Sequence, residues 1–326
     1  MALDEKYYEA AHSVLAARRA ENERIQLMRR AEVIAKAPEY AQLETKLADK
    51  ASGVVQLIMR KDKDFSAQLE ALKNEALSLN RAMESLLTSL GLDKDYLEPQ
   101  YTCKLCKDKG CVDGKWCGCF MKQVYAAASK ALNDRSPMKL KSFDDFDLSL
   151  YPDSSDKPSG GENPRKIMAQ NLSRCIEYAN SFDGTGSGML MIGATGLGKT
   201  HLSLAVANAV IERGYSAIYG SVPELLRMMD NEQFRRAEGD TMSLLLGCEL
   251  LILDDLGAET KSEYNIARLY EIINARVNRG IPMIISTNLN PQQINERYQD
   301  RIWSRLFSME VLMFSGTDNR IKLSNR

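Results

Sequence analysis

The chain lacks the features that mark membrane and secreted proteins. Its 326 residues contain no apolar run of about 18 residues, the minimum for a membrane-spanning helix. The charged start, Met-Ala-Leu-Asp-Glu-Lys, does not resemble a secretion leader. A net charge of −1 and a pI near 6.3 exclude a globally basic nucleic-acid binder but leave room for a local basic groove. These absences predict a cytoplasmic protein that does not associate with membranes.

Histidine is scarce as well, because His12 and His201 are the only two in the chain. A Ser-His-Asp hydrolase needs a histidine as its general base. His201 belongs to the predicted helix that follows the glycine-rich loop and is not available as such a base, so the sequence disfavours this class of enzyme.

The few cysteines are clustered. Five of the seven fall between Cys103 and Cys119, and in a reducing compartment such clustering favours a metal site over disulfides. Cys103-x₂-Cys106 and Cys117-x-Cys119 offer four thiolates, which predict a structural Zn²⁺ site without an open coordination position. Two alternatives stay open: Cys111 replaces one of the four ligands, or the cysteines are free buried thiols.

Length and pattern divide the chain into about two domains with smaller pieces between them. Residues 1–97 carry apolar residues at helical steps, interrupted at Pro38 and stopped at Gly91. The pattern favours a small bundle packed on itself over an arm that docks on a partner. The predicted divisions are a helical domain (1–97), a Cys-rich segment with its following helix (98–135), a linker (136–163) and an α/β domain (164–326).

In the last of these divisions, short apolar strands alternate with helical segments. Strands are expected at Met189–Ile192, Ser216–Tyr219, Glu249–Leu253 and Pro282–Thr287. Helices are expected over 164–182, 199–213, 241–246 and 262–279, and one more begins at Ser221. This alternation predicts an α/β fold with a parallel, doubly wound sheet, whose ligands bind beyond the carboxyl ends of the strands.

A glycine-rich loop follows the first expected strand. Residues 193–200 read Gly-Ala-Thr-Gly-Leu-Gly-Lys-Thr and fit G-x-x-x-x-G-K-[ST] at each fixed position. The glycines let successive N–H groups point into one concavity, and the following helix adds its N-terminal amides. Since a strand precedes and a helix follows, the loop predicts a nucleotide site rather than a chance turn. The expected binding residues are Gly193, Ala194, Thr195, Gly196, Leu197, Gly198, Lys199, Thr200 and His201.

Within this loop, Lys199 is expected to reach the β- and γ-phosphates, and Thr200 to bind Mg²⁺. Two carboxylates, Asp254 and Asp255, end the apolar run further along the chain. One can hold Mg²⁺ and the next can orient or deprotonate the attacking water. Alone, the pair has a turn or a helix cap as an equal alternative, but beside the phosphate loop it predicts the second half of the site. Asn288 ends another strand and is expected to hydrogen-bond the same water or the γ-phosphate.

These motifs carry a resemblance to a known family. The loop through Gly198-Lys-Thr-His-Leu202, the segment Leu253-Asp-Asp-Leu-Gly-Ala-Glu259 and Ser286-Thr-Asn288 resemble the AAA+ ATPases. Within that class the sequence is most similar to the DnaC/DnaI-type bacterial helicase loaders, with the IstB-type transposition ATPases beside them. The resemblance covers about residues 100–326. The Cys-rich segment also resembles that of loaders from Gram-positive bacteria and their phages.

The resemblance implies roles for the matching residues. Asp254 is the implied Mg²⁺ ligand and Asn288 the implied γ-phosphate sensor. Asp255 stands where many AAA+ proteins have Glu, which implies slow, switch-like hydrolysis; Glu259 is expected to assist it.

Further arginines match the family near the end of the chain. The segment Tyr298–Phe307 resembles the one that supplies an arginine finger to the neighbouring subunit, with Arg305 the first candidate and Arg301 the second. A helix with merely solvated arginines is the alternative. Arg320 resembles the second sensor, acting in cis. The usual helical lid is nearly absent, as in the loader group.

The resemblance implies an ATP-dependent loader of a hexameric, DnaB-type replicative helicase. The helical domain would grip the helicase, zinc would brace the junction, and ATP with Mg²⁺ would drive self-association on single-stranded DNA. Two other functions stay open: an IstB-type transposition helper on duplex DNA, and a nucleotide-gated adaptor that barely hydrolyses. Residues expected to contact DNA, with plain surface as an equal alternative, are Tyr219, Arg227, Phe234, Arg235 and Arg236.

Overall fold

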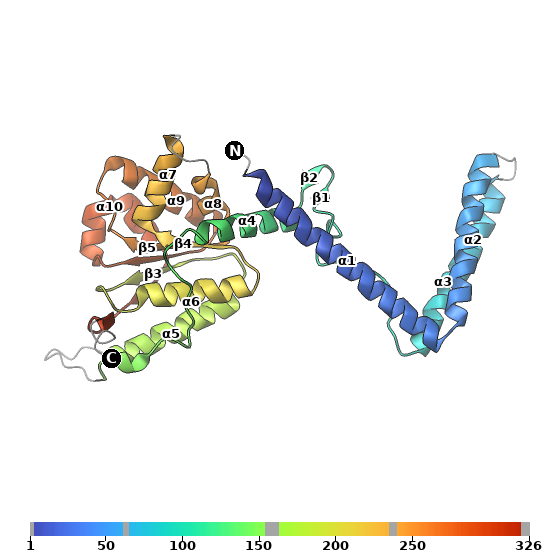
Figure 1. The fold of residues 1–326 in the computed structure, drawn as a ribbon, viewed down its shortest axis with the longest axis horizontal. Coiled ribbons are helices and arrows are strands. Elements are labelled where there is room, and N and C mark those ends of the chain that lie inside the picture. Colours follow the sequence, from blue (N-terminus) through green and yellow to red (C-terminus); the bar gives the residue numbers. More distant parts are fainter. Residues whose placement is uncertain (1–2, 61–64, 154–162, 235–239, 321–326) are drawn as a thin grey trace. The chain divides into compact units, whose positions relative to one another are not determined.

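The structure is a computed structural model that describes residues 3–60, 65–153, 163–234 and 240–320 (Figure 1). Its contacts divide the chain into two compact units. We call residues 13–117 the helical unit, and residues 1–12 together with 118–326 the sheet unit. Across the described residues, no helix combines the length and the apolar character needed to cross a membrane.

Long helices make up most of the helical unit. Their bounds are Glu5–Lys36 for α1, Glu39–Arg60 for α2 and Phe65–Ser89 for α3. α2 and α3 pack along each other (Figure 1). As predicted, Pro38 lies between α1 and α2, and Gly91 follows α3 with a left-handed backbone (φ 74°) that favours glycine at a helix end.

The three helices share only a small core. Val33, Tyr40 and Leu87 are buried together near the turn between α1 and α2. Further back along α1, Leu27 and Met28 are 65% and 60% exposed. The three helices thus pack on one another near this turn, whereas Leu27 and Met28 reach solvent, and the choice between a self-packed bundle and a partner-docking arm stays a prediction.

A short hairpin lies in the Cys-rich segment. β1 (Cys111–Val112) and β2 (Lys115–Trp116) pair in antiparallel fashion. Asp113 and Gly114 connect them, both with positive φ (49° and 75°). Two such residues in a row form the tight turn whose twist suits a hairpin, and Asp-Gly is a preferred sequence for it.

A parallel sheet forms the centre of the sheet unit, in the strand order β4-β5-β6-β3-β7. The strands are β3 (Met189–Ile192), β4 (Ala217–Ser221), β5 (Leu250–Leu256), β6 (Met283–Thr287) and β7 (Glu310–Met313). Every residue of β3 and β6 is buried, as expected where helices cover both faces of a parallel sheet. The predicted fold class, α/β with a parallel sheet, is confirmed.

Helices lie on both faces of this sheet (Figure 1). One face carries α5 (Pro164–Ser181) and α6 (Lys199–Glu212). The other carries α7 (Val222–Gln233), α8 (Thr241–Gly247), α9 (Glu263–Arg279) and α10 (Pro291–Leu306). α4 (Gly118–Asn133) packs beside β4.

Side-chain caps explain where several of these helices begin. Ser221 Oγ accepts a hydrogen bond from Glu224 N, so α7 starts where the sequence predicted. α10 and β7 were not among the helices and strands expected from the alternating pattern. The start of α10 has a clear signal, because Asn290 and Gln293 cap each other's backbone N–H in a capping box. β7 is only four residues long and shows little pattern of its own.

The strand order brings three strand ends together. β6 lies between β3 and β5, pairing Thr287 with Ile192 on one side and with Leu256 on the other. The loop after β3, the end of β5 and the residue after β6 therefore meet at one edge of the sheet. The phosphate loop, Asp254 and Asn288 all lie there.

The outer edge of β4 pairs with a side chain. Asn133 Nδ2 donates to Ala217 O at 2.7 Å, and Tyr219 N donates to Asn133 Oδ1 at 3.2 Å. The amide thereby satisfies one acceptor and one donor of the strand, as a neighbouring strand would.

Candidate nucleotide site

The phosphate loop has the backbone of an anion-binding nest. Gly196 and Gly198 have φ values of 77° and 88°, which only glycine adopts readily. Gly198 caps α6, and no side chain in the described residues caps the first amides of that helix. These amides and the positive end of the helix dipole face an incoming anion.

Lys199 is buried at the centre of the site. Its ammonium donates to Gly193 O (2.7 Å), Ala194 O (2.9 Å) and Asn288 Oδ1 (2.7 Å). Burial lowers the pKa of Lys199, and the charges of Asp255 and Asp254 oppose that shift. The structure thus brings together the lysine of the loop and the asparagine that the sequence placed at the end of a neighbouring strand.

A hydroxyl and a carboxylate form the second half. Thr200 Oγ1 donates to Asp254, 2.9 Å and 3.0 Å from its two oxygens, and Ser286 Oγ donates to Asp254 Oδ1 at 2.6 Å. Burial raises the pKa of Asp254, against the two hydroxyl hydrogen bonds. A hydroxyl beside a carboxylate next to a phosphate loop is the oxygen donor set that Mg²⁺ prefers, so the residues fit this ion.

Asp255 lies beside this pair in an unusual backbone conformation. Its φ is 56°, in the left-handed region, at an irregularity in the pairing of β5 with β6. Its N–H donates to Ser286 Oγ (2.9 Å), and Asn288 Nδ2 donates to its Oδ1 (3.3 Å). Asn288 therefore contacts both Lys199 and Asp255, which couples the phosphate-binding cation to the candidate water-binding carboxylate.

A cavity of about 300 Å³ opens over the loop. Of the predicted residues, its walls include Thr195 to His201, Asp255, Asn288 and Arg320. The imidazole of His201 lies 3.0 Å from Ser142 O and packs edge-on against Phe146. The predicted cis-acting Arg320 thus does line this cavity.

The other wall comes from residues that the sequence analysis assigned to a linker. Phe146, Leu150 and Tyr151 are buried in the core of the sheet unit and line the cavity. Tyr151 Oη donates to Leu197 O at 2.9 Å, and burial raises the pKa of Tyr151. The missed signal is the density of apolar residues from 143 to 151, which is unusual for a linker.

The arginine-finger candidates lie away from this cavity. Arg305 donates to Asn274 Oδ1 (2.7 Å), and its guanidinium stacks over the Tyr270 ring. Arg301 is exposed. Among the described residues that line the cavity, neither arginine is present.

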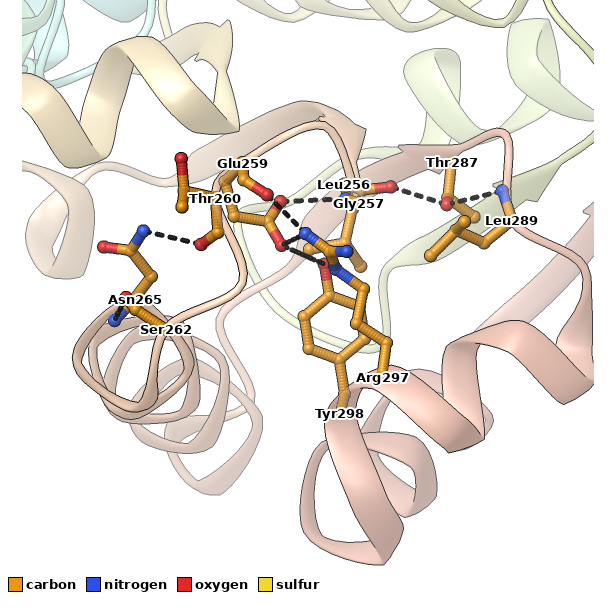
Figure 2. Close-up of polar contacts among 10 residues, drawn as sticks. All are labelled: Leu256, Gly257, Glu259, Thr260, Ser262, Asn265, Thr287, Leu289, Arg297 and Tyr298. Carbon is orange, nitrogen blue, oxygen red and sulfur yellow. Dashed lines mark hydrogen bonds and ion pairs between the residues drawn. The ribbon is translucent and has the colours of Figure 1, made fainter.

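Glu259 has partners outside the cavity (Figure 2). Its carboxylate accepts hydrogen bonds from Gly257 N (2.9 Å) and Tyr298 Oη (2.5 Å), and it forms an ion pair with Arg297 (3.0 Å). It is 5% exposed. None of these contacts is to the phosphate loop, so the expected direct help in hydrolysis stays a prediction.

The cysteine cluster fits zinc. The sulfur atoms of Cys103, Cys106, Cys117 and Cys119 lie within 4.8 Å of one another. Cys103 Sγ and Cys117 Sγ are 3.8 Å apart, and ligands about 2.3 Å from a tetrahedral Zn²⁺ are separated by about 3.8 Å. Gly110 N points at Cys106 Sγ (3.4 Å), a contact that supports a thiolate ligand. In the described part of the chain, Cys111 is exposed and outside this group.

The residues expected to contact DNA differ in how far they are exposed to solvent. Tyr219 is 6% exposed and packs in the core, so the expectation that it stacks on bases is wrong. Phe234 is 62% exposed and Arg227 is exposed, so both side chains reach solvent. Arg235 and Arg236 lie outside the described residues.

The fold and the site define a P-loop nucleotide-binding domain: a parallel sheet, a glycine loop with a buried lysine, and an acidic strand end beside it. Residues 169–307 match the family described as IstB-like ATP binding protein. This region therefore resembles the members of that family, and the predicted resemblance is confirmed.

The relatives fall into two groups by name, helicase loaders and ATP-binding proteins of insertion sequences. The chain is 28% identical over 138 residues to the replicative helicase loader DnaC of Escherichia coli (strain K12), covering 41% of this chain and 56% of DnaC. It is 27% identical over 141 residues to an ATP-binding protein in an insertion sequence of Mycobacterium tuberculosis (strain ATCC 25618 / H37Rv), covering 43% and 53%. A crystal structure of the DnaC helicase loader matches with 21% identity and a TM-score of 0.46, over 53% of this chain and 96% of that chain. The chain spans about half the length of the curated relatives it matches.

Proposed function

We propose that the protein is an ATP-binding and ATP-hydrolysing switch that loads a replicative DNA helicase onto single-stranded DNA. The observation that carries the proposal is the convergence of Lys199, Thr200 and Asp254 at one sheet edge. Homology to helicase loaders supports the choice of helicase as partner.

Each residue of the site has a proposed role. Lys199 would leave the loop carbonyls and bind the β- and γ-phosphates. Thr200 and Asp254 would hold Mg²⁺, which neutralises phosphate charge when bound. Asp255 would orient the attacking water, and Asn288 would sense the γ-phosphate because it contacts both Lys199 and Asp255.

Binding of a fluorescent ATP analogue tests the site. Lys199→Ala is expected to weaken binding by roughly 100-fold or more, since the lysine supplies the charge that faces the phosphates. Lys166→Ala, at an exposed position on α5, is the matched control and should bind as wild type does. Equal affinity in all three proteins would refute the nucleotide site.

We propose self-association in which one subunit's arginine completes the next subunit's site. Arg301 is the better placed of the two candidates, because Arg305 is already held by Asn274 and Tyr270. Mixing Arg301→Ala with Lys199→Ala protein tests this arrangement. Each variant alone should be inactive, and the mixture should regain ATP turnover, since an intact Lys199 then meets an intact Arg301. No recovery would mean that Arg301 does not act between subunits.

The partners are tested by co-purification. The helical unit would grip a hexameric, DnaB-type helicase, and the four cysteines would hold Zn²⁺ to brace the chain there. A complex with the purified helicase is expected with ATP and should release on hydrolysis. Failure to form it in any nucleotide state would count against the loader.

Phe234→Ala should weaken single-stranded DNA binding by about 1–3 kcal/mol if Phe234 stacks on a base.

Two other functions keep specific support. Similarity to insertion-sequence ATP-binding proteins supports a transposition helper, which would assemble on duplex DNA with ATP and without helicase. The short Asp255 side chain supports a nucleotide-gated adaptor. Equal ATP turnover by wild type and Asp255→Ala would favour the adaptor.

A further inference from the structure

A buried carboxylate next to the nucleotide site joins three groups from two elements. Glu259 Oε2 accepts from Gly257 N, while Oε1 accepts from Tyr298 Oη and Arg297 (Figure 2). Arg297 also donates to Glu259 O. Both carboxylate oxygens are therefore engaged with donors inside the protein, and the charge is paired. Such a group is suited to holding its partners in place.

One of these partners belongs to the turn that carries Asp255. Gly257 has φ 105° and Asp255 has φ 56°, and Ala258 N donates to Asp255 O at 3.0 Å to close the turn. A left-handed aspartate is unfavourable and persists only where surrounding contacts enforce it. Besides the contacts of Asp255 with Ser286 and Asn288, Glu259 accepts from Gly257 N, and Thr287 Oγ1 donates to Leu256 O (2.7 Å).

The other partners lie just before a break in α10. Arg297 and Tyr298 are helical, whereas Gln299 has φ 59° and ψ 177° and is not. The part of α10 after this break carries Arg301 and Arg305. Tyr298 is 1% exposed, and burial, together with the hydrogen bond to Glu259, raises the pKa of Tyr298.

We infer that Glu259 is a positioning residue for ATP hydrolysis. It locks the Asp255 turn against the first half of α10, so that one carboxylate joins this turn to the helical residues that lead into the arginine-bearing half. It does not touch substrate, because its oxygens are occupied and it stands outside the described lining of the cavity. This inference rests on the proposed function.

Two conservative variants separate positioning from chemistry. Glu259→Gln keeps one oxygen for Tyr298 and Arg297 but turns an amide N–H₂ toward Gly257 N–H, so the turn loses its acceptor. Tyr298→Phe leaves the carboxylate and removes only the hydroxyl. Asn265→Ala is the control, because it removes a hydrogen bond to Thr260 O in the following turn (Figure 2).

Steady-state ATP turnover and binding of a fluorescent ATP analogue are measured on full-length proteins. We expect kcat to fall roughly 10- to 100-fold in Glu259→Gln, and several-fold in Tyr298→Phe, because small misplacements of reacting groups have effects of this order. Analogue affinity should stay within about twofold in both, since neither residue contacts the phosphate loop. Asn265→Ala should match wild type.

Four outcomes would overturn the inference. The first is an unchanged kcat in Glu259→Gln. The second is an equal loss of affinity and kcat, which indicates a general loss of fold. The third is abolished turnover in Glu259→Gln with normal turnover in Tyr298→Phe, which indicates a direct chemical role for Glu259. The fourth, a wild type without ATP turnover, would overturn hydrolysis in the proposed function as well; in the first three, the proposed function survives.

Discussion

The helical unit and the sheet unit are stabilised in different ways. In the sheet unit, apolar side chains are buried in a large cluster that includes Met168, Leu202 and Ile252, and further ones, such as Leu251, Ile273 and Ile285, are buried outside that cluster. The described core of the helical unit is small, with Val33, Tyr40 and Leu87 at its centre, and its Cys-rich segment contributes little apolar burial. A segment with so small a core needs another source of stability, and a metal held by its Cys103, Cys106 and Cys117, with Cys119 in α4 as fourth ligand, would offer one. We therefore expect a change that destabilises the helical unit to leave nucleotide binding by the sheet unit unaffected.

Metal removal should give the largest difference between the units. A strong chelator is expected to abolish fixed structure in residues 98–117, since structural zinc contributes about 10–16 kcal/mol in small domains. Affinity for an ATP analogue should stay within about twofold. Hydrogen exchange of residues 98–117 and 189–200, with metal analysis, measures both effects.

Single cysteine variants provide the control for this experiment. Cys106→Ser should reproduce the chelator's effect, whereas Cys111→Ser should keep the metal, because Cys111 is exposed and outside the group of four. If residues 98–117 keep their protection from hydrogen exchange after complete metal removal, metal does not stabilise this segment and the proposed difference between the two units is wrong.

A buried arginine should give the next largest effect, confined to the sheet unit. Arg276 is fully buried and donates to Leu245 O (2.7 Å), Cys248 O (3.0 Å) and Pro282 O (2.6 Å). Arg276→Ala leaves these acceptors unpaired and should cost about 3–5 kcal/mol of unfolding free energy, measured by urea denaturation. Arg279→Ala, exposed on the same helix, should cost under about 0.5 kcal/mol. Similar losses in both variants would contradict this account of Arg276.

Tyr151→Phe tests whether the segment before α5 belongs functionally to the sheet unit. It removes the hydrogen bond to Leu197 O in the phosphate loop and should cost about 1 kcal/mol of stability. ATP affinity should fall a few-fold, measured with the same analogue. Tyr264→Phe, with its hydroxyl at the surface, should leave the affinity unchanged. An unaltered affinity in Tyr151→Phe would show that this wall does not support the loop.

The smallest effect is expected on the exposed side of α1. Leu27→Ala should change the unfolding free energy of the helical unit by less than about 0.5 kcal/mol, because Leu27 is already in solvent. Leu87→Ala, in the small core, should cost about 2–5 kcal/mol. Thermal or urea unfolding that ranks the two the other way would mean that Leu27 packs in solution.

The sequence predicted those parts of the sheet unit whose pattern is local. β3 is a continuous apolar run, β6 begins with one (Met283–Ile285), and the phosphate loop has glycines at fixed spacing. Lys199, Asp254 and Asn288 were expected to meet because each follows or ends a parallel strand, and the structure brings them together.

Features that depend on long-range packing were not predictable. Phe146 and Tyr151 reach the phosphate loop from a segment whose alternating apolar residues would suggest a strand, whereas Leu148–Leu150 forms a short 3-10 helix. The partners of Glu259 come from α10, almost 40 residues further along the chain. The sequence favoured Arg305 over Arg301, and the contacts of Arg305 with Asn274 and Tyr270 became visible only in the structure.

Asn133 has a consequence for how copies of the chain can meet. An open border of a parallel sheet exposes amides and carbonyls that recruit strands from other molecules, which leads to uncontrolled stacking. The carboxamide of Asn133, hydrogen-bonded to Ala217 O and Tyr219 N, occupies that border of β4. Any contact between copies of the chain would therefore have to avoid this part of β4, because Asn133 already satisfies a donor and an acceptor that another strand would need.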